Sequence, residues 1–504
     1  MDNVHFTVKI PPEAVGKRLS EYLAGIGMQV QAACGGRGTC GKCRVKVLSG
    51  SFYLDSSLSK QVVPDKDGTI LSCKAICSNE EAVIQLAFTE ENGLTDFLID
   101  VNDFSLQEYY AVALDIGTTT LACGLIFVSS SGAKIVKTVT EHNPQASYGA
   151  DVLSRISHAA SGRLADLQNS LLETISQMLS CLTSGLPSDC YPDKMVVVGN
   201  TTMLHIFCGV SPEKIGIYPF TPEFTDMKRL KGSDVGLCIE NIILFPSVSA
   251  FIGSDIVSGA FLTDLINHSE PLAIIDIGTN GEMILFTGKK CGSKLYAASA
   301  AAGPALEGAG ISSGTGGIKG AVCKVDFIGY TPVCKTIGDA PALGICASGL
   351  VDLVAGLRTL NIIDDTGYMD CGSYVYSCAE NGRNLAITQQ DVRALQLAKS
   401  AIRAGFEALC DEAGISLCQV NKVYIAGGFG FYMNIRSALA IGMFDPDLRG
   451  KLVNVGNSAF GGAVKYLARS EADREVNTIA DLCRTVDLNS SETFNCRFID
   501  YMGF

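Results

Sequence analysis

Two segments of this chain repeat the same plan of apolar strand, acidic turn and apolar strand. The first is YYAVALDIGTTTLACGLIF, residues 109–127, and the second is LAIIDIGTNGEMILF, residues 272–286. Asp115 and Asp276 each stand at the end of a strand, and a glycine two positions later permits a tight hairpin turn. Backbone amides and Thr or Asn side chains in such a turn can face phosphate oxygens. The pair therefore predicts a duplicated fold with two phosphate-binding hairpins.

A second repeat follows each hairpin along the chain. KMVVVGNTTMLHI at 194–206 and KVYIAGGFGFYMNI at 422–435 both run from an apolar strand through a glycine turn towards a helix. Long helical patterns precede them, at 151–181 and 388–413. We therefore expect two similar α/β lobes. The predicted boundaries are lobe I at 110–270, lobe II at 271–470 and a C-terminal tail at 471–504.

Three cysteines lie within ten residues near the amino terminus, in CGGRGTCGKC. Cys34, Cys40 and Cys43 are spaced C-x5-C-x2-C, and the next cysteine is Cys73. Zinc ribbons need two C-x2-C pairs or added histidines, whereas three clustered thiolates and one distant thiolate hold a 2Fe-2S cluster in ferredoxins. The glycines of the loop let backbone amides approach the cluster. Cys77 is the alternative fourth ligand; we prefer Cys73 because it directly follows the strand-like TILS.

The flanking segments predict the fold of this first region. HFTVKI, CRVKVL and AVIQLAF have strand patterns, and a helical stretch runs from about residue 13 to 24. This order fits a β-grasp ferredoxin domain over residues 1–92, followed by a linker at 93–109. The competing interpretation is a set of reduced structural thiols or a zinc site.

Composition limits the classes of partner. The 504 residues are 47 % hydrophobic and 18 % charged, with a net charge of −13 and no block of Lys or Arg. This balance argues against a nucleic-acid or membrane partner. The first thirty residues do not have the pattern of a signal peptide, so we expect a cytoplasmic protein. Twenty cysteines suit an anaerobe in which thiols stay reduced.

The two-lobe plan resembles the superfamily of acetate and sugar kinases, heat-shock ATPases and actin, which closes on ATP and Mg²⁺. The acidic hairpins match its phosphate motifs, and IAGGFG matches its adenosine motif. The resemblance implies that Asp115 and Asp276 organise Mg²⁺ and the attacking water. It further places Gly117, Thr118, Thr119, Gly278, Thr279 and Asn280 at the phosphates and Gly427 and Gly428 at the nucleotide. His205, after GNTTML, is expected to be a hydrogen-bonded core residue instead of a catalytic one.

The combination of both regions resembles the ATP-dependent reductive activators of corrinoid proteins. The segments that carry this resemblance are CGGRGTCGKCRVKVLSG, NPQASYGADVLSRI, VVVGNTTMLH, DIGTNGE, AAAGPALEGAGI, GICASGLVDLV and IAGGFG, in that order. The resemblance implies that the chain returns Co(II) to Co(I) in a corrinoid protein of a methyltransferase system, using ATP and the 2Fe-2S cluster. It also implies an upstream low-potential electron donor and a homodimer.

Two features depart from some members of that family. The tail holds only Cys483 and Cys496, so we expect no C-terminal cluster, and little room remains for a separate domain between the ferredoxin region and lobe I. Alternative functions are an activator of the 2-hydroxyacyl-CoA dehydratase type, a redox- and nucleotide-sensing binding protein, and a small-molecule kinase. The fused cluster region argues against the last.

Overall fold

The computed structural model describes residues 5–25, 43–54, 58–87, 108–130, 132–149, 151–187, 190–380, 382–428 and 433–504. Cys34, Cys40 and nearly all of the predicted linker lie outside these ranges. Within them, none of the helices is both long enough and apolar enough to cross a bilayer.

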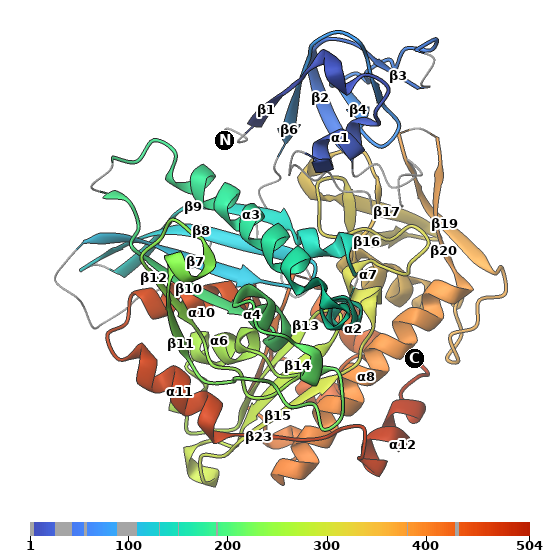
Figure 1. Ribbon diagram of the computed structural model, residues 1–504. Helices are drawn as coiled ribbons and strands as arrows, with labels where there is room; N and C mark the ends of the chain where they lie inside the picture. The colour runs from blue at the N-terminus through green and yellow to red at the C-terminus, as the bar shows by residue number, and fades with distance from the viewer. Residues whose placement is uncertain are drawn as a thin grey trace.

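The N-terminal region is a small sheet covered by one helix (Figure 1). Its strand order is β1-β6-β2-β4, with every pair antiparallel. The elements are β1 (His5–Ile10), α1 (Leu19–Gly25), β2 (Arg44–Ser49), β4 (Thr69–Leu71) and β6 (Ala82–Ala87), and β3 (Phe52–Tyr53) pairs with β5 (Ile76–Cys77). Leu19 and Leu23 of α1 pack on Ile84 of the sheet. The three strands expected from the sequence are confirmed.

The helix predicted from residue 13 is wrong in its first half. Only a short 3-10 turn, Pro12–Ala14, forms there, and α1 begins at Leu19. Gly16 between them has a φ of 77°, a left-handed conformation that ends the turn, and its N–H donates to the Cys77 carbonyl at 3.1 Å.

Lobe I is built on a six-stranded sheet of order β11-β12-β10-β7-β8-β9. The strands are β7 (Tyr109–Ile116), β8 (Thr120–Ser129), β9 (Gly132–His142), β10 (Lys194–Gly199), β11 (Lys228–Lys231) and β12 (Asn241–Leu244). The helices are α2 (Val152–His158), α3 (Leu164–Thr183), α4 (Thr201–Phe207), α5 (Gly232–Val235) and α6 (Ser254–Leu262). β7, β10 and β12 are parallel, and β7, β8 and β9 form an antiparallel meander.

Lobe II has a six-stranded sheet of order β22-β21-β13-β14-β15-β23. The strands are β13 (Leu272–Ile277), β14 (Gly281–Phe286), β15 (Leu295–Ala300), β21 (Lys422–Ala426), β22 (Leu452–Gly456) and β23 (Cys483–Thr485). Its helices are α7 (Ala347–Thr359), α8 (Gln389–Ala413), α9 (Ile435–Ala440), α10 (Ser458–Leu467), α11 (Ala472–Leu482) and α12 (Glu492–Asp500). Two small sheets are inserted, of β16 (Ala321–Ile328), β17 (Thr331–Thr336) and β18 (Gly344–Ile345), and of β19 (Ser373–Cys378) and β20 (Asn384–Thr388).

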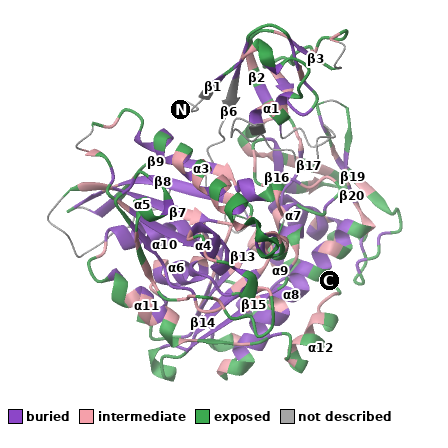
Figure 2. Cartoon of the chain, viewed as in Figure 1, coloured by how far each residue is buried: buried purple, intermediate pink, exposed green. Residues whose placement is uncertain are grey.

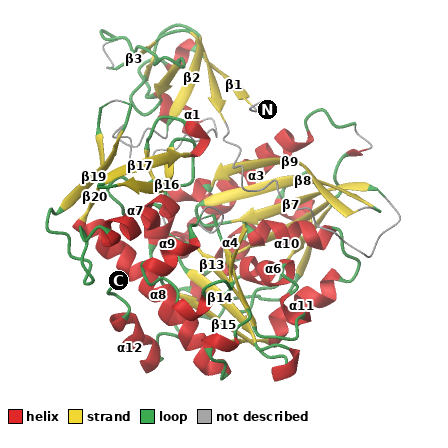
Figure 3. Cartoon of the chain, turned by 180° about the vertical axis from the view of Figure 1, so that it is seen from behind, coloured by secondary structure: helices red, strands yellow, loops and turns green. Residues whose placement is uncertain are grey.

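The two large sheets follow one plan, which confirms the predicted duplication. β7 and β13 carry the acidic turns; each has an antiparallel hairpin partner on one side and a parallel strand, β10 or β21, on the other. Seen from behind, β13, β14 and β15 lie among helices in the middle of the molecule, and β7, β8 and β9 run out to one edge of it (Figure 3). The duplicated α/β architecture expected from the sequence is therefore present.

A shared hydrophobic core joins the lobes through α6 and α10. It contains Ala111 and Ala113 of lobe I together with Ile274 and Ile284 of lobe II, all fully buried. The helices touch through small residues, because a Cβ on Gly462 would lie 2.1 Å from the Ser258 carbonyl oxygen. Figure 2 shows this buried middle of the molecule in purple. The lobes are thus held together on one side by close helix packing.

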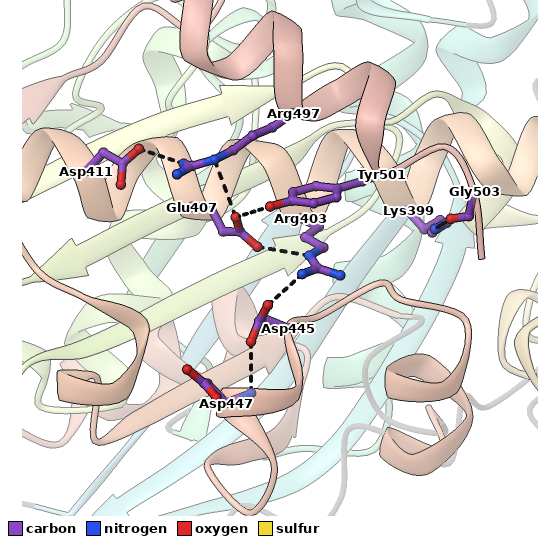
Figure 4. A network of polar contacts seen from close by, with 9 residues as sticks. All are labelled: Lys399, Arg403, Glu407, Asp411, Asp445, Asp447, Arg497, Tyr501 and Gly503. Carbon is purple, nitrogen blue, oxygen red and sulfur yellow. Dashed lines mark hydrogen bonds and ion pairs between the residues drawn. The ribbon is translucent and has the colours of Figure 1, made fainter.

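The last helix is fastened to α8 by a polar network (Figure 4). Arg497 contacts Asp411 at 2.6 Å, and the Tyr501 hydroxyl donates to Glu407 at 2.5 Å. Arg403 joins Glu407 to Asp445, and Lys399 donates to the Gly503 carbonyl. The last helix therefore packs against lobe II, where β23 also pairs with β15, while Asp473 of α11 forms an ion pair with Arg229 of lobe I.

Candidate functional site

The two acidic turns lie at the ends of β7 and β13, on facing lobes. Asp115 pairs in register with Ala122, and Asp276 pairs with Glu282. The Asn457 side chain, at the N-terminus of α10, donates to Asp115 at 2.9 Å. A lobe II residue therefore holds the acidic turn of lobe I in place.

Further carboxylates surround Asp276. Burial raises the pKa of Asp276 to about 8, and the negative charges of Asp255, Asp115 and Glu307 add to the rise. Burial, together with Asp255 and Asp276, also raises the pKa of Glu282 well above its ordinary value, while burial raises the pKa of Asp255 to about 6. Such mutual repulsion in a buried site is relieved by a proton or by a cation.

These carboxylates do not enclose an ion by themselves. Across the described ranges, no three His, Cys, Asp or Glu side chains form a group that could hold a metal ion. Mg²⁺ usually takes one or two protein carboxylates and keeps water or substrate phosphates as its other ligands. The arrangement suits a cation that arrives with a phosphate better than a dedicated metal cage.

Side chains from lobe I fix the first hairpin. Asn200, at the N-terminus of α4, donates to the Thr118 hydroxyl at 3.0 Å, and Asn143 donates to the Gly117 carbonyl at 2.8 Å. The buried Arg155 donates to the Thr118 carbonyl at 2.6 Å. These bonds engage two carbonyls and one hydroxyl of the hairpin and favour a single turn geometry.

Glu307 connects the two hairpins. Its carboxylate accepts from the Thr119 hydroxyl at 2.9 Å and from the Thr279 amide at 3.0 Å. Asn280, next in the second hairpin, hydrogen-bonds Glu282. Thr119 and Thr279 are thereby brought to one place, although they lie on different lobes.

The glycine turn after β21 approaches Asp276 closely. Gly427 has a φ of 94°, and a Cβ there would lie 2.7 Å from the Asp276 carboxylate and 2.5 Å from the Ile277 carbonyl oxygen. A side chain at this position would therefore displace Asp276. A Cβ on Gly428 would meet no atom of the described residues within 4 Å, so this glycine faces open space in that part of the structure.

His205 is a core residue, as predicted. It is fully buried; its Nδ1 lies 2.7 Å from the Thr201 carbonyl oxygen, and its Nε2 accepts from the Glu223 amide at 3.1 Å. The ring stacks on Phe224 with centroids 4.1 Å apart. Burial lowers the pKa of His205, which fits a neutral structural imidazole.

The described cysteines of the N-terminal region fall into two environments. Cys43 and Cys73 are buried, and the Ser72 amide donates to the Cys43 carbonyl at 2.8 Å, which brings their segments together. Cys77 belongs to the hydrophobic cluster with Leu19, and burial raises its pKa to about 11. The loop with Cys34 and Cys40 lies outside the described residues.

Several residues of the site were not expected from the sequence. Asp255 and Asn457 reach the opposite lobe's hairpin only through the packing of the lobes, whereas Glu282, Glu307 and Arg155 reach a hairpin through the fold of their own lobe. Glu282 lies in the quoted hairpin, and Arg155 and Glu307 lie in quoted motifs, NPQASYGADVLSRI and AAAGPALEGAGI. Their presence in those motifs was the sequence signal that could have identified them as site residues.

Comparison with protein families assigns all three regions. The profile of the 2Fe-2S iron-sulfur cluster binding domain matches residues 7–78. The profile of the RACo middle region matches residues 110–268, and that of the C-terminal domain of RACo, the ASKHA domain, matches residues 270–504. ASKHA denotes the kinase, heat-shock and actin superfamily, so the predicted fold class is confirmed.

Individual proteins agree along most of the chain. The corrinoid activation enzyme RamQ of Eubacterium limosum is 28 % identical, with 94 % of each chain covered. The [Co(II) methylated amine-specific corrinoid protein] reductase of Methanosarcina barkeri is 27 % identical over 77 % of this chain and 75 % of its own. A solved structure, the reductive activator for corrinoid, iron-sulfur protein, superposes with a TM-score of 0.71 at 28 % identity, covering 99 % of this chain and 96 % of its own.

The raised pKa of Asp276 predicts a pH-dependent stability. Between its ordinary value of 3.8 and about 8, the folded chain keeps a proton that the unfolded chain loses, so the free energy of unfolding falls as the pH rises. The slope from this group reaches at most about 1.4 kcal/mol per pH unit. Asp276→Asn should flatten the fall in the midpoint of chemical unfolding from about pH 5 to about pH 8. Asp326→Asn, in an exposed pair with Lys324, serves as control; parallel profiles for Asp276→Asn and wild type would contradict the assignment.

Proposed function

Because the chain belongs to the family of reductive activators of corrinoid proteins, we propose that it returns Co(II) to Co(I) in a corrinoid protein, with ATP driving the transfer. The observation that carries this proposal is the joining of a 2Fe-2S domain to an ASKHA domain along nearly the whole chain. The first domain carries single electrons, and the second binds and hydrolyses a nucleotide. A function that uses only one of these domains would not account for the presence of the other in the same chain.

Cys34, Cys40, Cys43 and Cys73 are the proposed ligands of the 2Fe-2S cluster, which supplies one electron at a time. Thiolates are the ligands that such a cluster takes, and Cys43 and Cys73 lie on segments joined by a backbone hydrogen bond. Cys77 is less suited, because its side chain packs in the core and its amide and carbonyl are bound to Lys17 and Gly16.

The facing hairpins are the proposed nucleotide site. Gly117, Thr118, Thr119, Gly278, Thr279 and Asn280 would hold the phosphates, and Gly427 and Gly428 the nucleoside. Asp115 and Asp276 would orient a phosphate-bound Mg²⁺ and the attacking water. Mg²⁺, when bound, neutralises charge on the phosphate oxygens. The buried carboxylates around Asp276 favour a cation there.

Nucleotide energy is needed because the electron transfer is unfavourable. A plant-type cluster has a potential of about −400 mV. The family resemblance implies that the corrinoid Co(II)/Co(I) couple lies lower. A conformational coupling of about 10⁴-fold, about 5.5 kcal/mol, offsets about 240 mV at about 59 mV per tenfold change. Closure of the two lobes on the nucleotide provides such a coupling if it favours a reducible form of the bound corrinoid protein.

The proposed oligomeric state, cellular compartment and electron donor follow from the family resemblance. We propose a homodimer in the cytoplasm that receives electrons from a low-potential donor and serves a methyltransferase system. Activators of the 2-hydroxyacyl-CoA dehydratase type hold one 4Fe-4S cluster between two subunits. The ferredoxin-type domain of this chain favours two irons per chain instead.

Serine substitutions separate the two candidate fourth ligands. Cys73→Ser should abolish the visible absorption of the reconstituted cluster and lower the iron content below two per chain, because one thiolate is lost. Cys77→Ser is the matched control and should keep both. Loss of the cluster in Cys77→Ser with retention in Cys73→Ser would reverse the assignment.

Asp276→Ala tests whether nucleotide chemistry in the lobes and electron transfer by the cluster domain depend on separate residues. ATP-dependent formation of Co(I), followed by absorbance in a mixture with a corrinoid protein, should fall by at least about a hundredfold, since an electrostatic group of a phosphate site is removed. The visible spectrum of the 2Fe-2S cluster should stay unchanged, and the exposed Asp326→Ala should behave as wild type. If the wild-type chain forms no Co(I) while its nucleotide binding persists, a sensing protein is the better description.

A further inference from the structure

Glu307 lies on a constrained backbone turn at the meeting point of the lobes. It ends a 3-10 turn, Pro304–Glu307, whose Ala305 and Leu306 are buried in the core of lobe II. Gly308 follows with a φ of 75°, and a Cβ there would lie 2.1 Å from the Thr315 carbonyl oxygen. The backbone of the turn therefore has little freedom, whereas the half-buried Glu307 side chain is held by its hydrogen bonds to the two hairpins.

Both oxygens of the Glu307 carboxylate are engaged, one by each lobe. Oε2 accepts from the Thr119 hydroxyl at 2.9 Å, and Oε1 accepts from the Thr279 amide at 3.0 Å. A Cβ on Gly278 would lie only 3.2 Å from Oε1, so the absence of a side chain there leaves space for the carboxylate. One anionic group thus bridges the two hairpins.

A phosphate would need the same partners. Like a carboxylate, it is an anion with several acceptor oxygens, and the proposed function assigns Thr119 and Thr279 to the phosphates. Two anions cannot share these donors at hydrogen-bond distance. The charges that face Glu307 are Arg155, which attracts it, and Asp276, which it repels.

We propose that the Glu307 carboxylate occupies a phosphate position between the hairpins and competes with the phosphates of the nucleotide. This inference rests on the proposed nucleotide site. Binding of nucleotide then exchanges an internal bridge between the lobes for a phosphate bridge, and Glu307 promotes release by taking the donors back. Glu307 acts as a positioning residue that sets the affinity of the site for phosphate-bearing ligands.

Calorimetric titration of the full, cluster-loaded chain tests this competition. The ligands are adenosine, ADP and a non-hydrolysable ATP analogue, each with Mg²⁺. Glu307→Gln keeps the size of the side chain and one acceptor oxygen while removing the charge. It should bind the ATP analogue at least about tenfold more tightly than wild type, because a charge-assisted hydrogen bond no longer has to be broken. Its affinity for adenosine should stay within about twofold, because adenosine carries no phosphate.

The controls distinguish a change of charge from a change of fold. Glu270→Gln removes a carboxylate that pairs with Lys290 at the surface and should bind all three ligands as wild type does. If Glu307→Gln does not fold, Glu307→Ala takes its place with the same expectation.

Equal or weaker binding of the ATP analogue by the Glu307 variant, while wild type binds, overturns the inference and leaves the proposed function intact. A wild-type chain that binds no nucleotide contradicts the proposed function, and the inference falls with it.

Discussion

Burial of negative charge between two lobes is the constraint on which the rest of the structure depends. Asp276 lies in a site where Asp255, Asp115 and Glu307 all oppose its ionisation. A chain gains nothing in stability from such a group, because burial penalises the charged form. In the proposed function, a cation that enters with a phosphate relieves this penalty, and this links the energetics of the fold to the binding of a nucleotide.

The same geometry explains how binding of a nucleotide between the hairpins can change the relative orientation of the two lobes. On one side the lobes are fixed by α6 and α10, whose small residues bring backbone against side chain. Hydrogen bonds also cross between the lobes, from Asn457 at the start of α10 to Asp115 and from the two hairpins to Glu307. A ligand that replaces those bonds can therefore change the angle between the lobes while their packed core stays intact.

The sequence pattern within a single segment was enough to predict those parts of the fold and site that are formed by residues close in sequence. The hairpins of Asp115 and Asp276, the helical patterns before each glycine turn and the cysteine spacing all depend on neighbours in sequence. The strands, the long helix at 388–413 and the family are confirmed. The helix predicted at 151–181 is instead divided into α2 and α3 by a kink at Gly162, which has a φ of 85°. Asp255 was missed as a site residue because only the docking of the lobes brings it to Asp276, and Glu307 was missed because the fold of lobe II brings it to the second hairpin from 28 positions away in sequence. The helix expected at residue 13 failed because Gly16 binds a distant carbonyl, that of Cys77. The roles of the individual site residues stay predictions.

The central claim is that nucleotide binding between the lobes makes an unfavourable electron transfer proceed. The most direct measurement is the amount of Co(I) formed in a corrinoid partner by the pre-reduced, cluster-loaded chain, with ATP and without any nucleotide. The account predicts that Co(I) accumulates only with ATP, while the cluster is reduced equally in both samples. Equal Co(I) in the two samples would contradict it.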